Sequence, residues 1–134
     1  MVKYQLHQCL GFRVRKLSRI IDNVYRSKLK AFGISENQLT ILFALHQNGL
    51  LEQGKLGEML GLERSSISRS IRLMVKNDWV KRSSDYRPLL ELTKTGQEFV
   101  KVLIPVWEEA MDQLTEQFSN QGVEWLSKLE QKMI

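Results

Sequence analysis

The chain has 134 residues, 43% of them hydrophobic, and a formal net charge of +5. This length and hydrophobic content are enough for one compact core, and a second independent domain would be unusual at this size. No apolar run is long enough to span a membrane, and the N-terminus lacks the pattern of a signal peptide. The single cysteine, Cys9, excludes an internal disulfide and fits a reducing compartment, so we expect a cytoplasmic protein without a membrane segment.

The first predicted element is a long helix from about residue 10 to Phe32, ended by Gly33. Its apolar residues recur at alternating spacings of four and three, which is the heptad-like pattern of a helix that packs along a partner. These residues are Leu10, Val14, Leu17, Ile21 and Val24.

Two shorter helices follow. A capping-box pattern from Ser35 to Gln38 opens the first, and Asn48-Gly49 closes it. The second covers residues 55–61, where Gly61 holds the position of a C-cap glycine. Its buried face is predicted from the helical spacing of Leu56, Met59 and Leu60.

The most informative element is the next predicted helix, residues 64–76. On a helical projection Ile67, Ile71 and Met74 form a narrow apolar stripe. The opposite side carries Ser65, Arg69, Arg72 and Lys76. Arginine forks suit phosphates and guanine edges, and short serine side chains let a helix lie close to a DNA major groove. A solvated charged face is the ordinary alternative.

A basic hairpin is predicted after this helix, with strands at residues 79–82 and 89–92 and a polar break between them. Helix, tight turn, helix and β-wing together form a DNA-binding module. Residues 64–87 hold seven Lys/Arg against two Asp/Glu, whereas residues 88–134 hold four against eight. The cations are therefore concentrated where DNA would be read.

The C-terminal part is predicted to be helical. The segment from Thr95 to Glu98 is a capping-box pattern that opens a long helix, and Pro105 should kink this helix or shift its start. A last helix covers residues 122–134. The terminal helices carry more apolar surface than one small chain can cover, which indicates a second copy, although an intramolecular core is the alternative. The predicted dimer contacts are Leu10, Val14, Leu17, Phe118, Trp125, Leu126 and Leu129.

Four segments in order resemble the MarR-type winged-helix regulators: Leu60-Gly61-Leu62, Ser66-Ile67-Ser68-Arg69, Asp85-Tyr86-Arg87 and Leu92-Thr93-Lys94-Thr95-Gly96. The resemblance implies a mainly α fold with a small β-wing, a winged helix-turn-helix with N- and C-terminal dimerisation helices. We expect a single domain, 1–134, in which residues 1–32 and 96–134 form the dimerisation helices and residues 33–95 the DNA-binding region.

The resemblance also implies residue roles: Ser68 and Arg69 touch bases, Arg87 enters the minor groove, and Asp85 steadies Arg87 and nearby basic residues. Only Ser83-Ser84 separates Arg82 from Asp85, so this wing is shorter than is usual in the family, and we expect Arg87 to contact phosphate instead. The full set of predicted DNA-binding residues is Arg64, Ser65, Ser66, Ser68, Arg69, Arg72, Lys76, Asp85 and Arg87.

The leading hypothesis is a homodimeric transcriptional repressor that binds double-stranded DNA at a palindromic operator. The resemblance implies release by a small aromatic or phenolic effector. One alternative is the same scaffold switched by oxidation of Cys9, because some members of the family sense peroxides through a lone cysteine near the start of the first helix. Another is a winged-helix protein-interaction module without an operator. No enzymatic activity, cofactor or metal is expected, because His7 and His46 lack neighbours at ligand spacing.

Overall fold

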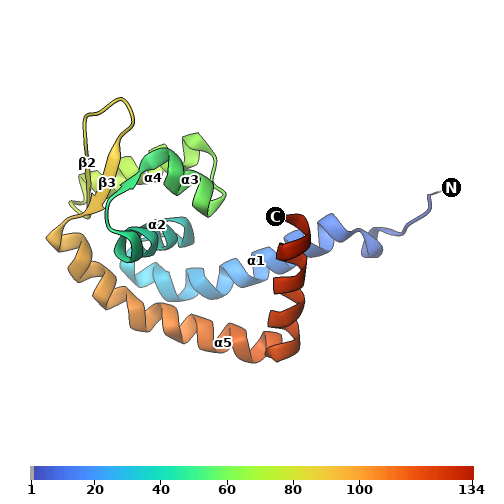
Figure 1. The fold of residues 1–134 in the computed structure, drawn as a ribbon. Coiled ribbons are helices and arrows are strands. Elements are labelled where there is room, and N and C mark those ends of the chain that lie inside the picture. The colour runs from blue at the N-terminus through green and yellow to red at the C-terminus, as the bar shows by residue number, and fades with distance from the viewer. Residues whose placement is uncertain (1) are drawn as a thin grey trace. The chain divides into compact units, whose positions relative to one another are not determined.

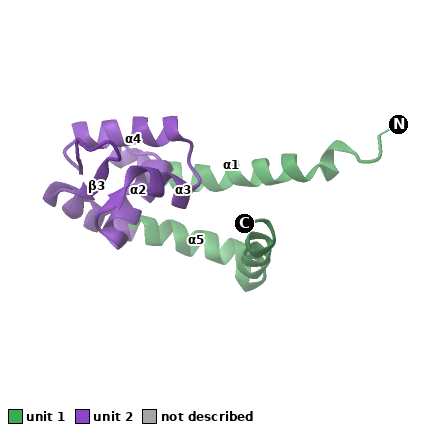
Figure 2. Ribbon diagram, turned by 45° about the horizontal axis from the view of Figure 1, so that its top comes forward, with its two compact units in different colours: residues 1–28, 106–134 green, residues 29–105 purple. Residues whose placement is uncertain are grey.

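The computed structural model describes residues 2–134, which form two compact units (Figure 2). Unit 1 contains the chain up to Lys28 and from Val106 onward, and unit 2 spans Leu29–Pro105. The fold is mainly helical with one small sheet, as predicted (Figure 1). The helices are α1 (Leu10–Leu29), α2 (Glu36–Asn48), α3 (Gln53–Leu60), α4 (Arg64–Lys76) and α5 (Lys94–Met133), with 3-10 turns at Leu6–Gln8 and Lys30–Phe32; the strands are β1 (Leu51–Glu52), β2 (Val80–Arg82) and β3 (Leu89–Leu92).

The three strands form an antiparallel sheet in unit 2, in the order β1-β3-β2. Central β3 places Leu90 opposite Leu51 on one side and opposite Arg82 on the other. The two strands of the predicted hairpin are confirmed. The two-residue strand β1 was missed, because so short a segment has no measurable period.

Helix α2 forms the centre of the unit 2 core, where it contacts α3, α4 and β3. Its start is fixed by the predicted capping box: the Ser35 hydroxyl accepts from the Gln38 amide, and the Gln38 side chain accepts from the Ser35 amide at 2.9 Å. Gly49 caps its end, also as predicted. Buried apolar side chains surround it, chief among them Leu39, Ile41, Leu42, Leu45, Leu56, Ile71, Met74 and Leu90.

The residues at the start of α5 are hydrogen-bonded to the base of the wing. The Thr93 amide donates to the Trp79 carbonyl at 3.0 Å, and the Thr93 hydroxyl accepts from the Gly96 amide at 2.9 Å. The Thr93 hydroxyl in turn donates to the Asp78 carbonyl. Thr93 is therefore the cap, and the capping box predicted from Thr95 is wrong. A side chain at position 96 would lie 2.0 Å from the Trp79 carbonyl oxygen, so this junction requires glycine.

Within unit 1, α1 packs against the part of α5 that begins at Val106. The Tyr25 hydroxyl donates to the Met111 sulfur at 3.3 Å, and the Lys28 ammonium lies 3.1 Å from the Glu109 carboxylate. Ala110 and Leu114 are buried.

The helix α5 is interrupted at Ser119, whose backbone angles of φ 61° and ψ 171° are non-helical (Figure 1). Pro105, where we expected a kink or a shifted start, lies inside α5, and the non-helical residue is Ser119. Such a backbone conformation is populated almost only by glycine, so Ser119 is a strained joint. It separates the C-terminal fourteen or so residues as the distinct last helix that the sequence indicated.

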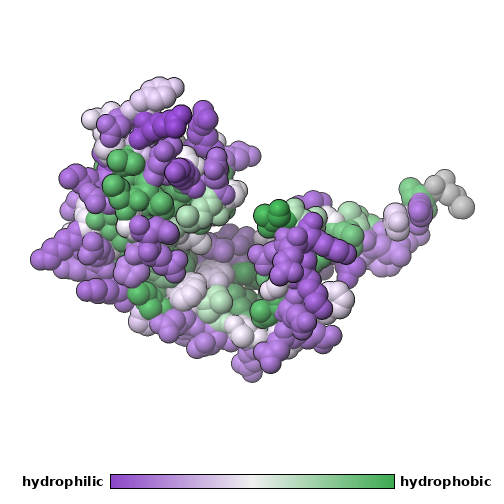
Figure 3. All heavy atoms as spheres, in the orientation of Figure 1, coloured by the Kyte–Doolittle hydropathy of each residue, from purple (hydrophilic) through white to green (hydrophobic). Residues whose placement is uncertain are grey.

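Large apolar side chains remain on the surface of unit 1. In α1, Leu10, Val14 and Leu17 are between 59% and 71% exposed, and beyond Ser119 Trp125 is 60% exposed. Figure 3 shows hydrophobic residues on the surface at the C-terminal end of the chain. Phe118, a predicted dimer contact, is half-buried. We call the exposed large apolar side chains of α1 and of the segment after Ser119 the apolar seam of unit 1: Leu10, Val14, Leu17, Val123, Trp125, Leu126 and Leu129.

Candidate nucleic-acid interface

Helix α4 packs against the core through its predicted apolar stripe. Ile67, Ile71 and Met74 are each at most 2% exposed, and the helix contacts α2, α3 and β2. Burial of these three side chains fixes which side of the helix faces the core, at about 1.5–3 kcal/mol each. The opposite side is therefore outward, and Arg64, Ser65, Arg69, Arg72 and Lys76 are exposed as predicted, while Ser66 and Ser68 are half-buried.

The turn between α3 and α4 is tight. Gly61 ends α3 in the left-handed conformation, with φ 66°, and the Leu62 amide donates to the Gly57 carbonyl at 3.0 Å. This is the helix-turn-helix that the sequence indicated. One side chain was placed wrongly: Met59 is 54% exposed, because α3 buries only the narrow face that includes Leu56.

The wing is short. Beyond the β2–β3 ladder the Ser83 amide donates to the Leu89 carbonyl at 2.9 Å, and the Leu89 amide donates to the Ser83 hydroxyl at 2.8 Å. Pairing therefore continues almost to the tip, which consists of residues 84–88. Tyr86 is 99% exposed there, and Asp85 and Arg87 are exposed beside it. Within residues 2–134 neither Asp85 nor Arg87 takes part in an ion pair, although the resemblance implied that Asp85 steadies Arg87.

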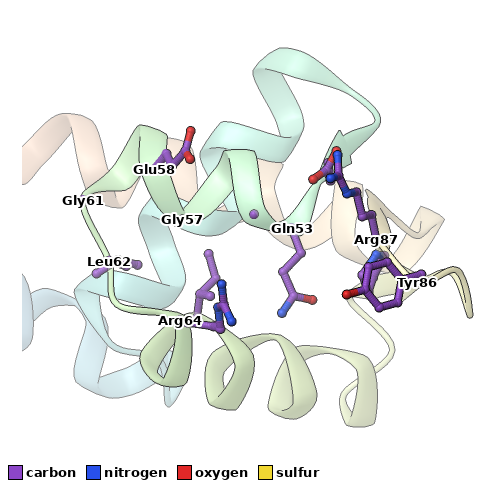
Figure 4. Close-up of a pocket in the computed structure, with 12 residues that line it drawn as sticks. Gln53, Gly57, Glu58, Gly61, Leu62, Arg64, Tyr86 and Arg87 are labelled. Carbon is purple, nitrogen blue, oxygen red and sulfur yellow. The ribbon is translucent and has the colours of Figure 1, made fainter.

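A cavity of about 850 Å³ opens between α3, the first turn of α4 and the wing tip. Figure 4 shows Arg64 on the α4 side and Tyr86 with Arg87 on the wing side. The floor has little side-chain bulk where Gly54, Gly57 and Gly61 line it. Two cations thus face one concave surface from different elements.

The basic residues of this surface are not neutralised internally. Within residues 2–134, neither ion pair involves them: one joins Lys28 to Glu109 and the other joins Lys128 to Glu124, all in unit 1. Arg64, Arg69, Arg72, Lys76 and Arg87 therefore keep their full charge toward solvent, as a phosphate-binding surface needs.

The remaining candidates are isolated side chains. Cys9 is exposed just before α1, and the exposed His7 and His46 lie on different elements. In the part of the chain that the structure describes, no three His, Cys, Asp or Glu side chains are grouped so that they could hold a metal ion. No helix between residues 2 and 134 is long and apolar enough to cross a membrane.

Comparison with known proteins agrees with this geometry. The model of the MarR family matches residues 34–86, which include α2, β1, α3, α4 and β2. The transcriptional repressor MprA of Escherichia coli (strain K12) is 29% identical over 124 residues, which are 87% of this chain and 69% of MprA. The uncharacterized HTH-type transcriptional regulator YwoH of Bacillus subtilis (strain 168) is 26% identical over 99 residues, 72% of this chain and 69% of YwoH.

Solved structures share the fold. Bordetella bronchiseptica BpsR, whose DNA binding is regulated by 6-hydroxynicotinic acid, has a TM-score of 0.86 at 16% identity, with all of both chains covered. A cysteine-to-serine mutant of MarR from Escherichia coli, complexed with operator DNA, has a TM-score of 0.81 at 18% identity, with 93% of each chain covered. The relatives are transcriptional regulators, not enzymes.

Proposed function

We propose that the chain is a winged-helix transcriptional regulator of the MarR family, and that it is a repressor that binds a palindromic operator as a homodimer. One observation carries the proposal: α4 buries Ile67, Ile71 and Met74 and directs unpaired cations and short hydroxyl side chains outward. A rigid helix with this outer face fits the major groove.

Residue roles follow from position on the helix. Ser68 and Arg69 lie in the first half of α4 and are proposed to read base edges, since the N-terminal residues of a recognition helix reach deepest. Arg64, Arg72 and Lys76 are proposed to hold phosphates, which fix orientation without reading sequence.

The homodimer is proposed from the apolar seam of unit 1. Exposed leucines and a tryptophan in two separate helical segments are more apolar surface than a monomer usually leaves in water. A second copy is the simplest cover, because two-fold homodimers predominate and palindromic operators mirror their symmetry.

Release by a small molecule is the proposed regulation. BpsR, which shares the fold, has its DNA binding regulated by 6-hydroxynicotinic acid, and this supports a small aromatic effector here as well. Oxidation of Cys9 is the alternative switch. The thiol is exposed and so accessible to peroxides, which is the observation that favours it.

Replacing Arg69 with alanine should weaken operator binding and relax sequence preference by about 1–3 kcal/mol, the value of one bidentate base contact. Folding should survive, because Arg69 is exposed. The measurement is a competition gel shift, in which a true regulator prefers its palindrome over bulk DNA by roughly 10³-fold or more. Lys101→Ala, an exposed cation on α5, is the matched control. Undiminished specific binding by Arg69→Ala would refute the assignment of α4 as the recognition helix.

Replacing Arg87 with alanine should reduce affinity equally on operator and random DNA, because the short wing tip limits Arg87 to phosphate. Loss of one phosphate contact lowers the salt slope by about one. The measurement is a salt titration on two operators that differ only in their flanks. A larger loss on narrow A·T-rich flanks would show instead that Arg87 enters the minor groove.

A further inference from the structure

Gln53 is the only polar side chain that is buried within residues 2–134, at 9% exposure. A buried carboxamide is costly unless it is hydrogen-bonded. Two hydrogen bonds of this residue lead to the wing: its backbone N–H donates to the Pro88 carbonyl at 2.9 Å, and its side-chain Oε1 accepts from the Arg82 Nε at 3.0 Å. The first residue of α3 therefore joins the two arms of the β2–β3 hairpin.

The hydrogen bond to Gln53 involves only the Nε of Arg82. Arg82 is exposed at the end of β2, a strand that packs against α4. Neither of its terminal nitrogens is hydrogen-bonded or ion-paired in the part of the chain that the structure describes. Figure 4 shows the Gln53 side chain pointing from α3 toward α4. Its partner Arg82 lies on β2, the strand that contacts α4.

A guanidinium fixed through Nε presents its outer edge as a fixed fork. Two N–H groups of such a fork match two phosphate oxygens, and a pre-fixed side chain loses less freedom on binding than a free one. The neighbouring Lys81 is a useful contrast, since it is an exposed cation on the same strand that takes part in no ion pair within residues 2–134.

We propose that Arg82 binds a phosphate of duplex DNA and that Gln53 is the positioning residue that orients it and anchors the wing to α3. This rests on the proposed function, because it assumes that the α4 surface contacts DNA. The ligand is the sugar-phosphate backbone, so the contact contributes equally on any duplex sequence.

The first test needs no DNA. In ¹⁵N NMR of the full chain, the Arg82 Nε proton, identified by its loss in Arg82→Ala, should be protected from solvent exchange. Gln53→Leu should abolish the protection, and Gln53→Glu, which keeps an acceptor oxygen, should retain it. Absence of a protected Nε proton in the wild type, or persistence of the protection in Gln53→Leu, overturns the positioning role.

The second test is a salt titration on random-sequence duplex. Arg82→Ala should weaken binding about three- to tenfold and lower the salt slope by about 0.9, as loss of one phosphate contact does. Arg82→Lys keeps the charge but not the fork, and should recover less than half of the loss. Lys81→Ala is the matched control and should leave the slope unchanged. An equal effect of Lys81→Ala would mean that only general charge matters, which overturns the phosphate assignment.

A double-mutant cycle completes the test. Gln53→Leu should weaken binding in the wild type but add nothing in the Arg82→Ala background, because its effect acts through Arg82. Equal losses in both backgrounds would mean a merely structural role and overturn the proposal.

A wild type that binds random and palindromic DNA equally well would overturn the operator hypothesis, yet leave the Arg82 result valid. If the wild type binds no duplex, both DNA roles fail, and the exchange measurement still decides whether Gln53 holds Arg82.

Discussion

Replacing Gly96 with alanine should destabilise the protein by at least about 3 kcal/mol. The new methyl group would lie 2.0 Å from the Trp79 carbonyl oxygen, a backbone atom that also accepts from the Thr93 amide. Relief requires the start of α5 to move away from the wing base, which would break the Thr93 cap as well. Thermal unfolding should show the melting temperature lowered by roughly 10 °C or more.

Gly54→Ala is the control for this substitution. Gly54 is an exposed residue in the first turn of α3, and an added methyl group would meet only the Glu52 side chain at an ordinary 3.5 Å. Alanine is the better helix former, so this variant should be stabilised by up to about 1 kcal/mol. If both variants have the same melting temperature as the wild type, the close approach at Gly96 is wrong.

Removing residues 119–134 should convert a dimer into monomers or aggregates. The deletion takes away Trp125, Leu126 and Leu129, so the Leu10, Val14 and Leu17 side of the apolar seam would lose its proposed cover. Light scattering of the full-length chain is the first measurement, followed by the same measurement on the truncated chain.

Two observations sharpen this experiment. Lys132→Ala alters an exposed polar position of the deleted segment and should leave the dimer intact. Trp125 is 60% exposed in the single chain, so dimer formation should bury it. Its fluorescence emission should therefore shift to shorter wavelength as the protein concentration is raised. A clean monomer of the full-length chain at micromolar concentration would contradict the homodimer and leave the apolar seam unexplained.

Sequence patterns predicted the features that depend on near neighbours. The Ser35–Gln38 capping box, the Gly61 turn and the buried stripe of α4 each follow from residues a few positions apart, where local geometry decides the outcome. The order of helices and wing strands was predictable for the same reason.

Two of the differences come from contacts between residues distant in sequence. Thr93 rather than Thr95 caps α5, because Thr93 is bonded to the Trp79–Asp78 turn across the sheet. The bond between Gln53 and Arg82 spans 29 positions and has no periodic signature. A separate last helix was predicted from residue 122, but the exact place of the break, Ser119, had no signal, since serine seldom adopts a positive φ.

The full exposure of Tyr86 makes the wing tip accessible to proteases. Exposed loop tips are preferred sites of proteolytic nicking, and the bond after Tyr86 suits a protease that cleaves after aromatic residues. The next bond, between Arg87 and Pro88, resists proteases that cleave after basic residues, because proline follows the arginine. Limited chymotrypsin digestion with and without DNA therefore footprints the wing from the protein side, through the fragments cut after Tyr86, without labelling or mutation.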